Sequence, residues 1–220
     1  MTMQFPLLEV LDDAARRELI SRARRRRFAR HEVVFHEGDP GDALHLVVLG
    51  HVAVRVHTPL GDVATVRILR PGQCFGELAV ISPAPRSGTA VALDPVETLS
   101  LDRTLFEDLR TRHPEVDLVI REVLVTMARS LTVQLVDAMY VPAEQRVWRR
   151  LLELADVFGT AEAPATVVPI TQEVVAQLAG CTRPTANQIL RSGEDAGLIR
   201  MERGRIEFLD LAMIERRAST

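Results

Sequence analysis

Lysine is absent from the chain, and cysteine is rare. All 27 basic residues are arginine, which we attribute to a GC-rich genome rather than to function. The two cysteines, Cys74 and Cys181, lie far apart in the sequence, so they predict neither a disulfide framework nor a CxxC metal site. Such sparing use of cysteine is typical of a reducing cytoplasm.

Long apolar runs and catalytic signatures are also missing. No run approaches the ~20 residues that a membrane span needs, and the first residues, MTMQFPLLEVLDD, lack the pattern of a secretory signal. No nucleophile motif, HExxH, P-loop or GxGxxG occurs, and the six histidines do not cluster at metal-ligand spacing. We therefore expect a cytoplasmic protein that is not an enzyme and has no membrane partner, metal or covalent cofactor.

The bulk composition allows a folded protein of modest size. The chain has 220 residues, of which 47% are hydrophobic and 26% are charged, which suits two small domains or one large one. The net charge of −3 excludes a generally basic nucleic-acid coat protein. It does not exclude DNA binding, because only the contact face must be basic.

The first half of the chain changes from helix to strands. Apolar spacing predicts a helix over residues 7–27, whose arginines at 22–27 are interpreted as a solvated helix end rather than a nucleic-acid patch. Short apolar runs separated by turn signals then predict strands at 33–35, 44–49, 52–56, 63–69, 89–93 and 96–101. Strands at this spacing indicate an all-β sandwich or roll.

Helices return after the strands. Asp102 is the expected N-cap of a helix at 103–112, a long helix is expected to run from Pro114 to Tyr140, and another is expected at 143–158. Packing onto its own domain could explain the apolar stripe of the long helix. The alternating spacing of four and three residues favours instead a dimer seam formed by Ile120, Leu124, Met127, Leu131, Gln134 and Ala138.

Residues 170–199 have the pattern of a helix-turn-helix. Thr171 is a suitable N-cap for the first helix, Gly180 suits the turn, and Thr182 caps a second helix with Pro184 in its first turn. A hairpin at residues 199–208 follows as a wing. The alternative is a purely structural helical hairpin with a solvated face.

The second of these helices presents the polar residues that a major-groove reader needs. Arginine can donate two hydrogen bonds to guanine, while hydroxyls and amides can hold phosphates. We predict that DNA is contacted by Thr171, Thr182, Arg183, Pro184, Thr185, Asn187, Gln188 and Arg191.

The sequence resembles the CRP/FNR superfamily of bacterial transcription regulators. The resemblance rests on FHEGDPGDALHLVVLGHVAV, on PGQCFGELAVISPAPRSGTAVAL, and on ITQEVVAQLAGCTRPTANQILR followed by EDAGLI. It implies an α+β fold with a jelly-roll-like β-roll sensor at 1–113, a dimerisation helix at 114–140 and a winged helix-turn-helix at 141–220. It also implies a homodimer that binds palindromic double-stranded DNA and works with RNA polymerase.

The same resemblance implies a cyclic-nucleotide site in the sensor. The family's glycine and glutamate for the ribose match Gly76 and Glu77, with Leu78 beside them, and its arginine and serine for the phosphate match Arg86 and Ser87. The effector implied is cAMP, with cGMP as the alternative. Such residues suit a phosphodiester, which favours a guanidinium fork, a hydroxyl and backbone amides.

The chain departs from the family pattern at two places. The base-contact positions of the long helix hold Gln134 and Leu135, and Gln134 could either bind a base or fix the register of a dimer. In the recognition helix Arg183 is kept as an expected guanine reader, but Pro184 and Gln188 replace two family base readers. Two alternatives follow: a regulator with a degenerate sensor, or a cyclic-nucleotide-binding regulatory subunit.

Overall fold

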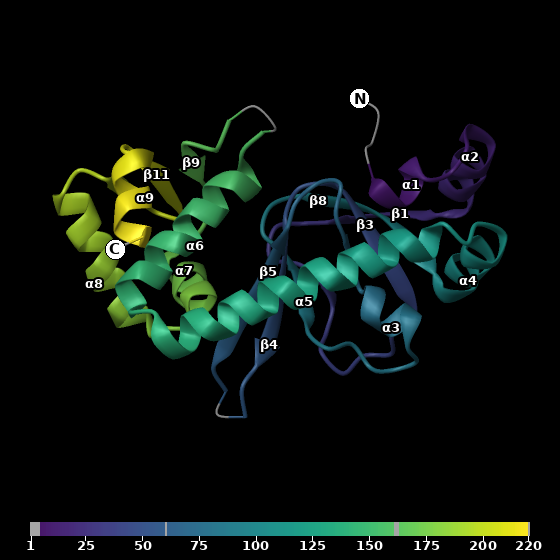
Figure 1. The fold of residues 1–220 in the computed structure, drawn as a ribbon, viewed down its shortest axis with the longest axis horizontal. Coiled ribbons are helices and arrows are strands. Elements are labelled where there is room, and N and C mark those ends of the chain that lie inside the picture. The colour runs from purple at the N-terminus through teal and green to yellow at the C-terminus, as the bar shows by residue number, and fades with distance from the viewer. Residues whose placement is uncertain (1–4, 60, 161–162, 220) are drawn as a thin grey trace. The chain divides into compact units, whose positions relative to one another are not determined.

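A computed structural model describes residues 5–59, 61–160 and 163–219. The chain forms two compact units, one comprising residues up to 56 together with 67–130, and the other comprising 57–66 together with the chain from 131 onward. Figure 1 shows the ribbon coloured by residue number, so that the segments of each unit can be located. The fold is of the α+β class, as the sequence predicts.

The first unit is built on a β-roll of two antiparallel sheets. One sheet has the strand order β1 (Arg24–Phe28), β8 (Val96–Asp102), β3 (Ala43–Leu49) and β6 (Cys74–Phe75). The other has the order β2 (Val33–Phe35), β7 (Thr89–Ala92), β4 (Val52–His57) and β5 (Val63–Leu69). The predicted strands are thus confirmed to within a residue or so at their ends, whereas β1 and the two-residue β6 were not expected.

The prediction of one helix over residues 7–27 is wrong. Two short helices occur, α1 (Pro6–Glu9) and α2 (Asp13–Arg22), because Asp12 caps α2 by accepting from the amide of Ala15 at 2.8 Å. The arginines that follow belong to strand β1 and pair with β8, where Glu97 forms ion pairs with Arg25 and Arg27. Tertiary pairing with β8 therefore overrides the local helical pattern.

Apolar side chains on the two faces of the first sheet form two cores. Val47, Val52, Leu69 and Phe75 fill the inside of the roll. On the other face, residues such as Leu44 and Leu101 pack against α4 (Arg103–Arg112) and the start of α5 (Val116–Tyr140). Asp102 caps α4 as expected, accepting from the amide of Leu105 at 2.8 Å. The helix α5 is thereby anchored to the roll at its first turns.

His45 is a titratable residue that is buried in the roll, where it is 2% exposed. It stacks on Phe75 with ring centroids 5.0 Å apart, and its Nδ1 lies 3.2 Å from the Thr98 hydroxyl. Burial, together with the nearby charges of Arg86 and Arg26, lowers the pKa of His45 to about 3. The imidazole is consequently neutral in the folded protein at any physiological pH.

We expect His45 to make the protein less stable in acid. Below its ordinary pKa of 6.5 the unfolded chain binds a proton that the folded chain does not, so stability falls as the pH drops from 6.5 toward 3. The slope from this residue is about 1.4 kcal/mol per pH unit. Urea unfolding of the wild type and of His45→Gln at pH 7.5 and pH 5 measures the difference. An equal loss of stability in both proteins would contradict the assignment.

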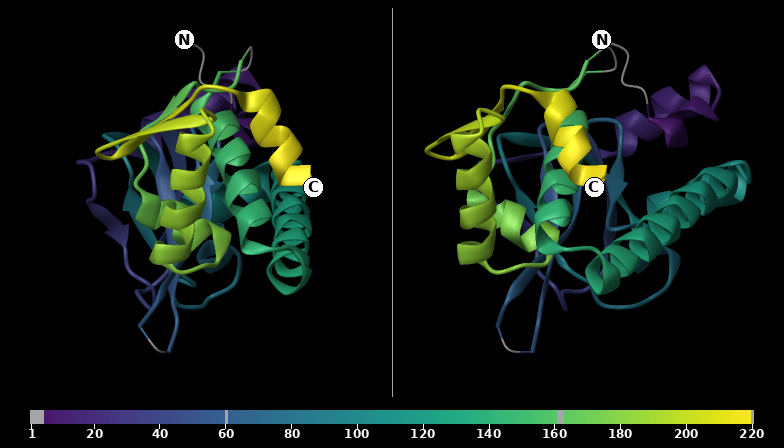
Figure 2. Two further views of the ribbon diagram at one scale, coloured as in Figure 1. Left: turned by 90° about the vertical axis from the view of Figure 1, so that its left-hand side faces the viewer. Right: turned by 60° about the vertical axis from the view of Figure 1, so that its left-hand side comes forward.

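The second unit contains four helices and a small sheet after the end of α5. The helices are α6 (Ala143–Phe158), α7 (Gln172–Ala179), α8 (Arg183–Asp195) and α9 (Leu211–Ser219). The antiparallel sheet has the order β10 (Ile199–Glu202), β11 (Arg205–Phe208) and β9 (Val167–Val168), of which β9 was not expected. Figure 2 shows α9 lying along α6, with β10 and β11 beside α8.

Two contacts fix helices in this unit. A Cβ atom at Gly193 would lie 2.2 Å from the Trp148 ring, so glycine allows α8 to approach the fully buried tryptophan of α6. In the last turns of α5 the buried Asp137 carboxylate lies 2.6 Å from Arg149 and 3.4 Å from Arg150 of α6. The corner between α5 and α6 is therefore braced by ion pairs as well as by apolar packing.

Among the described residues, no helix is long and apolar enough to span a membrane.

Candidate functional site

The segment between β6 and β7 contains the residues that the sequence predicts to bind a cyclic nucleotide in the sensor, which we call the cassette: Gly76, Glu77, Leu78, Arg86 and Ser87. Gly76 precedes the short helix α3 (Glu77–Ile81) with φ at +79°, a conformation that L side chains rarely adopt. A Cβ atom there would lie 2.5 Å from Nη1 of Arg86. Glycine is thus required at this position both for the turn and for the close approach of the arginine.

Arg86 is a buried cation with incomplete hydrogen bonding. Its side chain is 2% exposed; Nη1 donates to the Gly76 carbonyl at 3.1 Å and Nη2 donates to Asp42 at 3.1 Å. The guanidinium lies over the Phe35 ring, 4.1 Å from its centroid. Within the described residues its Nε atom is buried and has no hydrogen-bond partner. Burial lowers the pKa of Arg86, and nearby acidic groups, first among them Asp42, oppose that shift.

This arrangement suits an anion. The Asp42 carboxylate that pairs with Arg86 is 85% exposed, so the solvent screens it. An unpaired buried N–H costs free energy until a ligand or water accepts from it. A phosphate oxygen would do so with a charge-assisted bond.

The remaining cassette residues differ in their exposure. Glu77 is buried at 4% exposure, and its Oε1 accepts from Nη1 of Arg67 at 3.3 Å. Ser87 is exposed beside Arg86, and Leu78 is 39% exposed. The structure therefore brings Gly76, Glu77 and Arg86 together, with Ser87 next to Arg86 in the chain; their role in binding a nucleotide stays a prediction.

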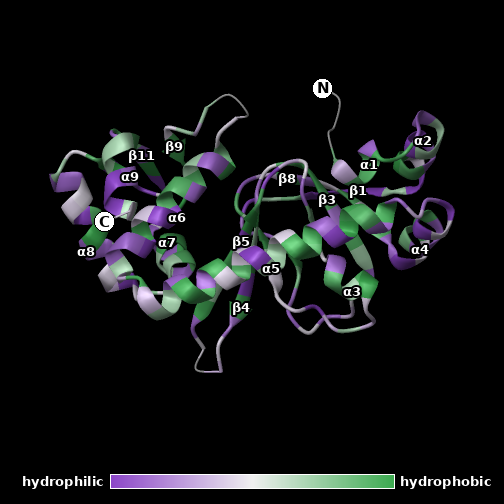
Figure 3. Cartoon of the chain, in the orientation of Figure 1, coloured by the Kyte–Doolittle hydropathy of each residue, from purple (hydrophilic) through white to green (hydrophobic). Residues whose placement is uncertain are grey.

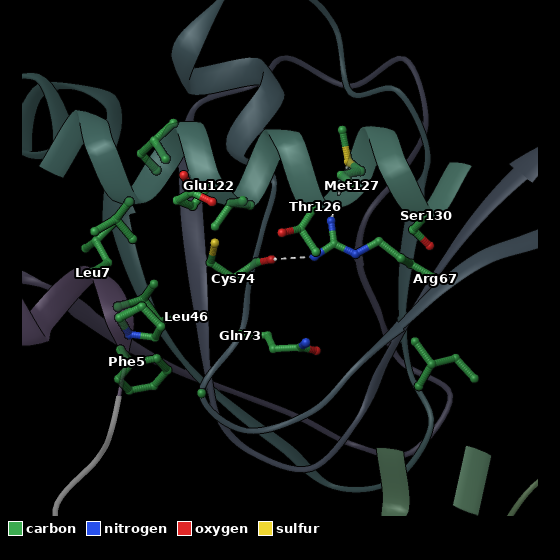
Figure 4. A pocket seen from close by; sticks show the side chains of 16 residues that line it. Phe5, Leu7, Leu46, Arg67, Gln73, Cys74, Glu122, Thr126, Met127 and Ser130 are labelled. Atoms are coloured by element: carbon green, nitrogen blue, oxygen red, sulfur yellow. Dashed lines mark hydrogen bonds between the residues drawn. The ribbon is translucent and has the colours of Figure 1, made fainter. Parts of the chain in front are cut away.

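Arg67, which no sequence motif includes, lies against the cassette residue Glu77. It lies on β5 and lines a cavity of about 440 Å³ between the roll and the first half of α5 (Figure 4). The one signal in the sequence was an arginine inside the apolar strand VATVRIL. The Cys74 thiol lines the same cavity, and burial raises its pKa to about 12, so it stays protonated.

The predicted dimer seam is divided by the structure. Ile120 is 5% exposed and packs in the core of its own unit, with Leu124 half-buried against it, while Met127 lies 3.6 Å from Arg67. Ile120 is therefore wrongly assigned to a dimer interface, because its own domain already covers it. Farther along, Leu131 is 45% exposed and Ala138 is exposed, and Gln134 is half-buried.

Apolar residues nevertheless remain exposed along the second half of α5. Figure 3 shows the hydropathy of the residues along this helix. Leu135 is 60% exposed, and the small residue Ala128 is also exposed. Five residues follow one another at spacings of four, three, four and three, which places them on one face of the helix: Leu124, Ala128, Leu131, Leu135 and Ala138. This row, which we call the outer seam, is rotated by a few tens of degrees from the predicted one. Gln134 and Leu135 belong to the second unit, and their role in reading a base stays a prediction.

The helix-turn-helix has the caps and the turn that the sequence predicts. Thr171 caps α7 by accepting from Val174 at 3.4 Å, and Thr182 caps α8 by accepting from Thr185 at 3.4 Å. Gly180 ends α7 with φ at +60°. These local signals set the two helices, and α8 presents its first turn to the surface.

The predicted DNA-contacting residues fall into two groups. Two of them are half-buried: the Thr185 hydroxyl lies 2.8 Å from that of Thr182, and Asn187 donates to the side chain of Gln172 at the start of α7. The others are exposed at the surface, namely Thr171, Thr182, Arg183, Pro184, Gln188 and Arg191. Asn187 therefore braces α8 against α7 in this structure.

The wing adds cations that the sequence analysis did not include. A groove of about 220 Å³ separates the wing turn from the start of α7 and from Arg183, whose guanidinium lies 3.5 Å from Glu173. Arg205 forms an ion pair with Glu202, whereas exposed Arg203 forms no ion pair with any residue that the structure describes. The groove thus has arginines on both sides, which suits a phosphate backbone.

Comparisons with known proteins agree with both halves of this description. Residues 25–113 match the cyclic nucleotide-binding domain family, and residues 145–217 match the Crp-like helix-turn-helix domain family. The chain is 34% identical to the CRP-like cAMP-activated global transcriptional regulator of Mycobacterium tuberculosis, over 87% of this chain and 86% of that one. It is 30% identical to the cyclic AMP receptor protein of Thermus thermophilus, over 89% and 88%.

A solved structure extends the agreement to three dimensions. A CRP-family transcriptional regulator from Thermus thermophilus superposes with a TM-score of 0.74 at 26% identity, covering 89% of this chain and 97% of that one. The sequence resemblance, the paired domains and the fold lead to one assignment. The chain belongs to the CRP/FNR superfamily of DNA-binding transcription regulators, which are not enzymes.

Proposed function

We propose that this protein is a homodimeric transcription regulator whose DNA binding is controlled by a 3′,5′-cyclic nucleotide. The observation that carries the proposal is Arg86, a buried guanidinium whose Nε donor is unpaired in the described structure. Ligand binding would supply the missing acceptor.

The cassette suits the two polar parts of such a ligand. The Arg86 fork and the Ser87 hydroxyl would bind the phosphate, and the Glu77 carboxylate would accept from the ribose 2′-hydroxyl. Gly76 leaves room for Arg86, and Leu78 at 39% exposure would cover one side of the ligand. Two relatives are named for their response to cAMP, which makes cAMP the first effector to test and cGMP the alternative.

Dimerisation would use the outer seam of α5. The exposed apolar side chains of Leu131 and Leu135 need a partner surface, and a second α5 helix offers the same spacing. Gln134, half-buried beside the seam, would fix the register or contact the base.

The DNA-binding half suits a palindromic operator. Two recognition helices of a symmetric dimer would enter major grooves about one helical turn (~34 Å) apart. Arg183 would read a guanine, while exposed Arg191 and the wing residue Arg203 would hold phosphates. We propose that the bound dimer contacts RNA polymerase and acts in the cytoplasm.

A mobility-shift assay on operators selected from genomic fragments tests the proposal. We expect cAMP or cGMP to tighten DNA binding by about tenfold or more, since a ligand worth a few kcal/mol shifts the population of states by that much. Tight DNA binding that neither nucleotide changes would identify a regulator with a degenerate sensor. Failure to bind any DNA would contradict the proposal and favour a regulatory subunit.

Replacing Arg183 with alanine should relax sequence preference. The substitution removes the fork that reads guanine, at a cost of about 1–3 kcal/mol per half-site. Binding that remains should be weak and sensitive to salt, because it depends on phosphates. Arg200→Ala is the control, because Arg200 is an exposed wing arginine paired with Glu207 at 2.7 Å. Unchanged discrimination between the operator and a single-base variant would contradict the role of Arg183.

A further inference from the structure

The chemical class of the base follows from an arginine that no cassette motif includes. Arg67 projects from β5 across the 440 Å³ cavity beneath α5, and its side chain is 27% exposed (Figure 4). Its Nη1 lies 3.3 Å from Oε1 of Glu77 and 3.6 Å from the Met127 sulfur, and its Nη2 lies 3.4 Å from the Cys74 carbonyl. The guanidinium thus lies between the cassette and the cavity.

These bonds leave Arg67 available to a ligand. The two N–H···O contacts are longer than the 2.7–3.2 Å of well-formed hydrogen bonds, so the described residues hold the guanidinium only weakly. Glu77 is 5% exposed at its side chain, which makes the Arg67 cation its counter-charge. The ion pair uses Oε1 of Glu77, and in the proposed function Oε2 would accept from the ribose hydroxyl.

The position of Arg67 relative to Glu77 determines what part of a nucleotide it meets. In the proposed function, Glu77 accepts from the ribose 2′-hydroxyl, and the adjoining ribose carbon carries the base. The base must therefore lie next to Glu77, on the side away from the phosphate held by Arg86. Arg67 is the cation next to Glu77, with its Nη1 3.3 Å from Oε1 of that carboxylate, so it is placed to meet the base.

We infer that Arg67 selects a 6-oxopurine base, so that the preferred effector is of the cyclic GMP class. The N7 and O6 atoms of guanine are two adjacent acceptors that match the donor fork of an arginine. Adenine presents an amine donor in place of O6, and a guanidinium has no acceptor for it. Arg67 is in this sense a specificity-determining residue; the inference rests on the proposed cyclic-nucleotide site.

Calorimetric titration with cAMP, cGMP and cyclic inosine monophosphate tests the inference. Inosine keeps O6 and N7 but lacks the 2-amino group of guanine. We expect the wild type to bind the two 6-oxopurine nucleotides about tenfold or more tightly than cAMP, as a bidentate arginine contact predicts. Arg67→Lys keeps the positive charge beside Glu77 but loses the fork. We expect this variant to lose the preference for 6-oxopurines, so that its affinities for cGMP and cyclic inosine monophosphate fall to about its affinity for cAMP.

Two further variants keep the outcomes distinct. Arg70→Lys is the matched control, because Arg70 is exposed at the end of the same strand, does not line the cavity, and should leave the preference unchanged. Arg86→Ala should lower the affinity for all three nucleotides by a similar factor. Tighter binding of cAMP than of cGMP by the wild type, or an unchanged preference in Arg67→Lys, would overturn the inference and leave the proposed function standing. Binding of no nucleotide by the wild type would overturn both.

Discussion

Arg86→Ala is expected to abolish nucleotide control of DNA binding while leaving the fold intact. Truncating one partner of a buried charged hydrogen-bonded pair costs about 2–5 kcal/mol, so the affinity for a cyclic nucleotide should fall by about 30-fold or more. The ligand-free protein should lose little stability, because the guanidinium is buried, its Nε has no partner in the part of the chain that the structure describes, and its counter-ion Asp42 is largely exposed. Calorimetric titration and thermal unfolding measure the two effects separately.

The combination of readouts separates a binding role from a structural one. A structural arginine would reduce the melting temperature of the ligand-free protein, whereas a binding arginine would reduce only the rise in melting temperature that the nucleotide causes. Arg25→Ala is the control, because Arg25 is an exposed arginine of β1 in the same unit. Undiminished nucleotide affinity in Arg86→Ala would refute the cassette assignment.

Leu131→Arg is expected to convert a dimer into monomers. Leu131 is 45% exposed in the single chain and lies in the middle of the outer seam. Two facing guanidinium groups would be desolvated and would repel each other across a helix pair. Loss of the second binding module should weaken binding to a full palindrome by about 100-fold or more, while binding to a half-site changes little. Sedimentation without nucleotide gives the mass, and fluorescence anisotropy gives the DNA affinity.

Val133→Arg is the matched control for this substitution. Val133 is also exposed, at 59%, but residues two apart on a helix do not share a face, so it lies away from the outer seam. The side-chain charge changes equally in the two variants. A dimeric mass for Leu131→Arg, or dissociation of both variants, would show that another surface holds the subunits together.

The differences between expectation and structure have physical causes. The arginines of residues 24–27 continue a helical pattern in sequence, yet they form a strand because β8 offers a partner edge and Glu97 offers a counter-charge. Ile120 fits a dimer seam by spacing, but the spacing of a helix stripe does not say which neighbour covers it. Asn187 has the chemistry of a base reader, and only the packing of α7 against α8 brings Gln172 within reach of it.

The sequence by itself determined the features that depend on near neighbours in the chain. The N-caps Asp102, Thr171 and Thr182, the left-handed Gly180 and the order of roll, helix and helix-turn-helix all follow from local conformation and periodicity. Tertiary structure decided which distant groups meet, because burial and partner choice depend on surfaces that only folding creates. Among the described residues it left the Nε of Arg86 without a hydrogen-bond partner, and it placed Arg67 beside Glu77; these two features are the basis of the proposed ligand and its base.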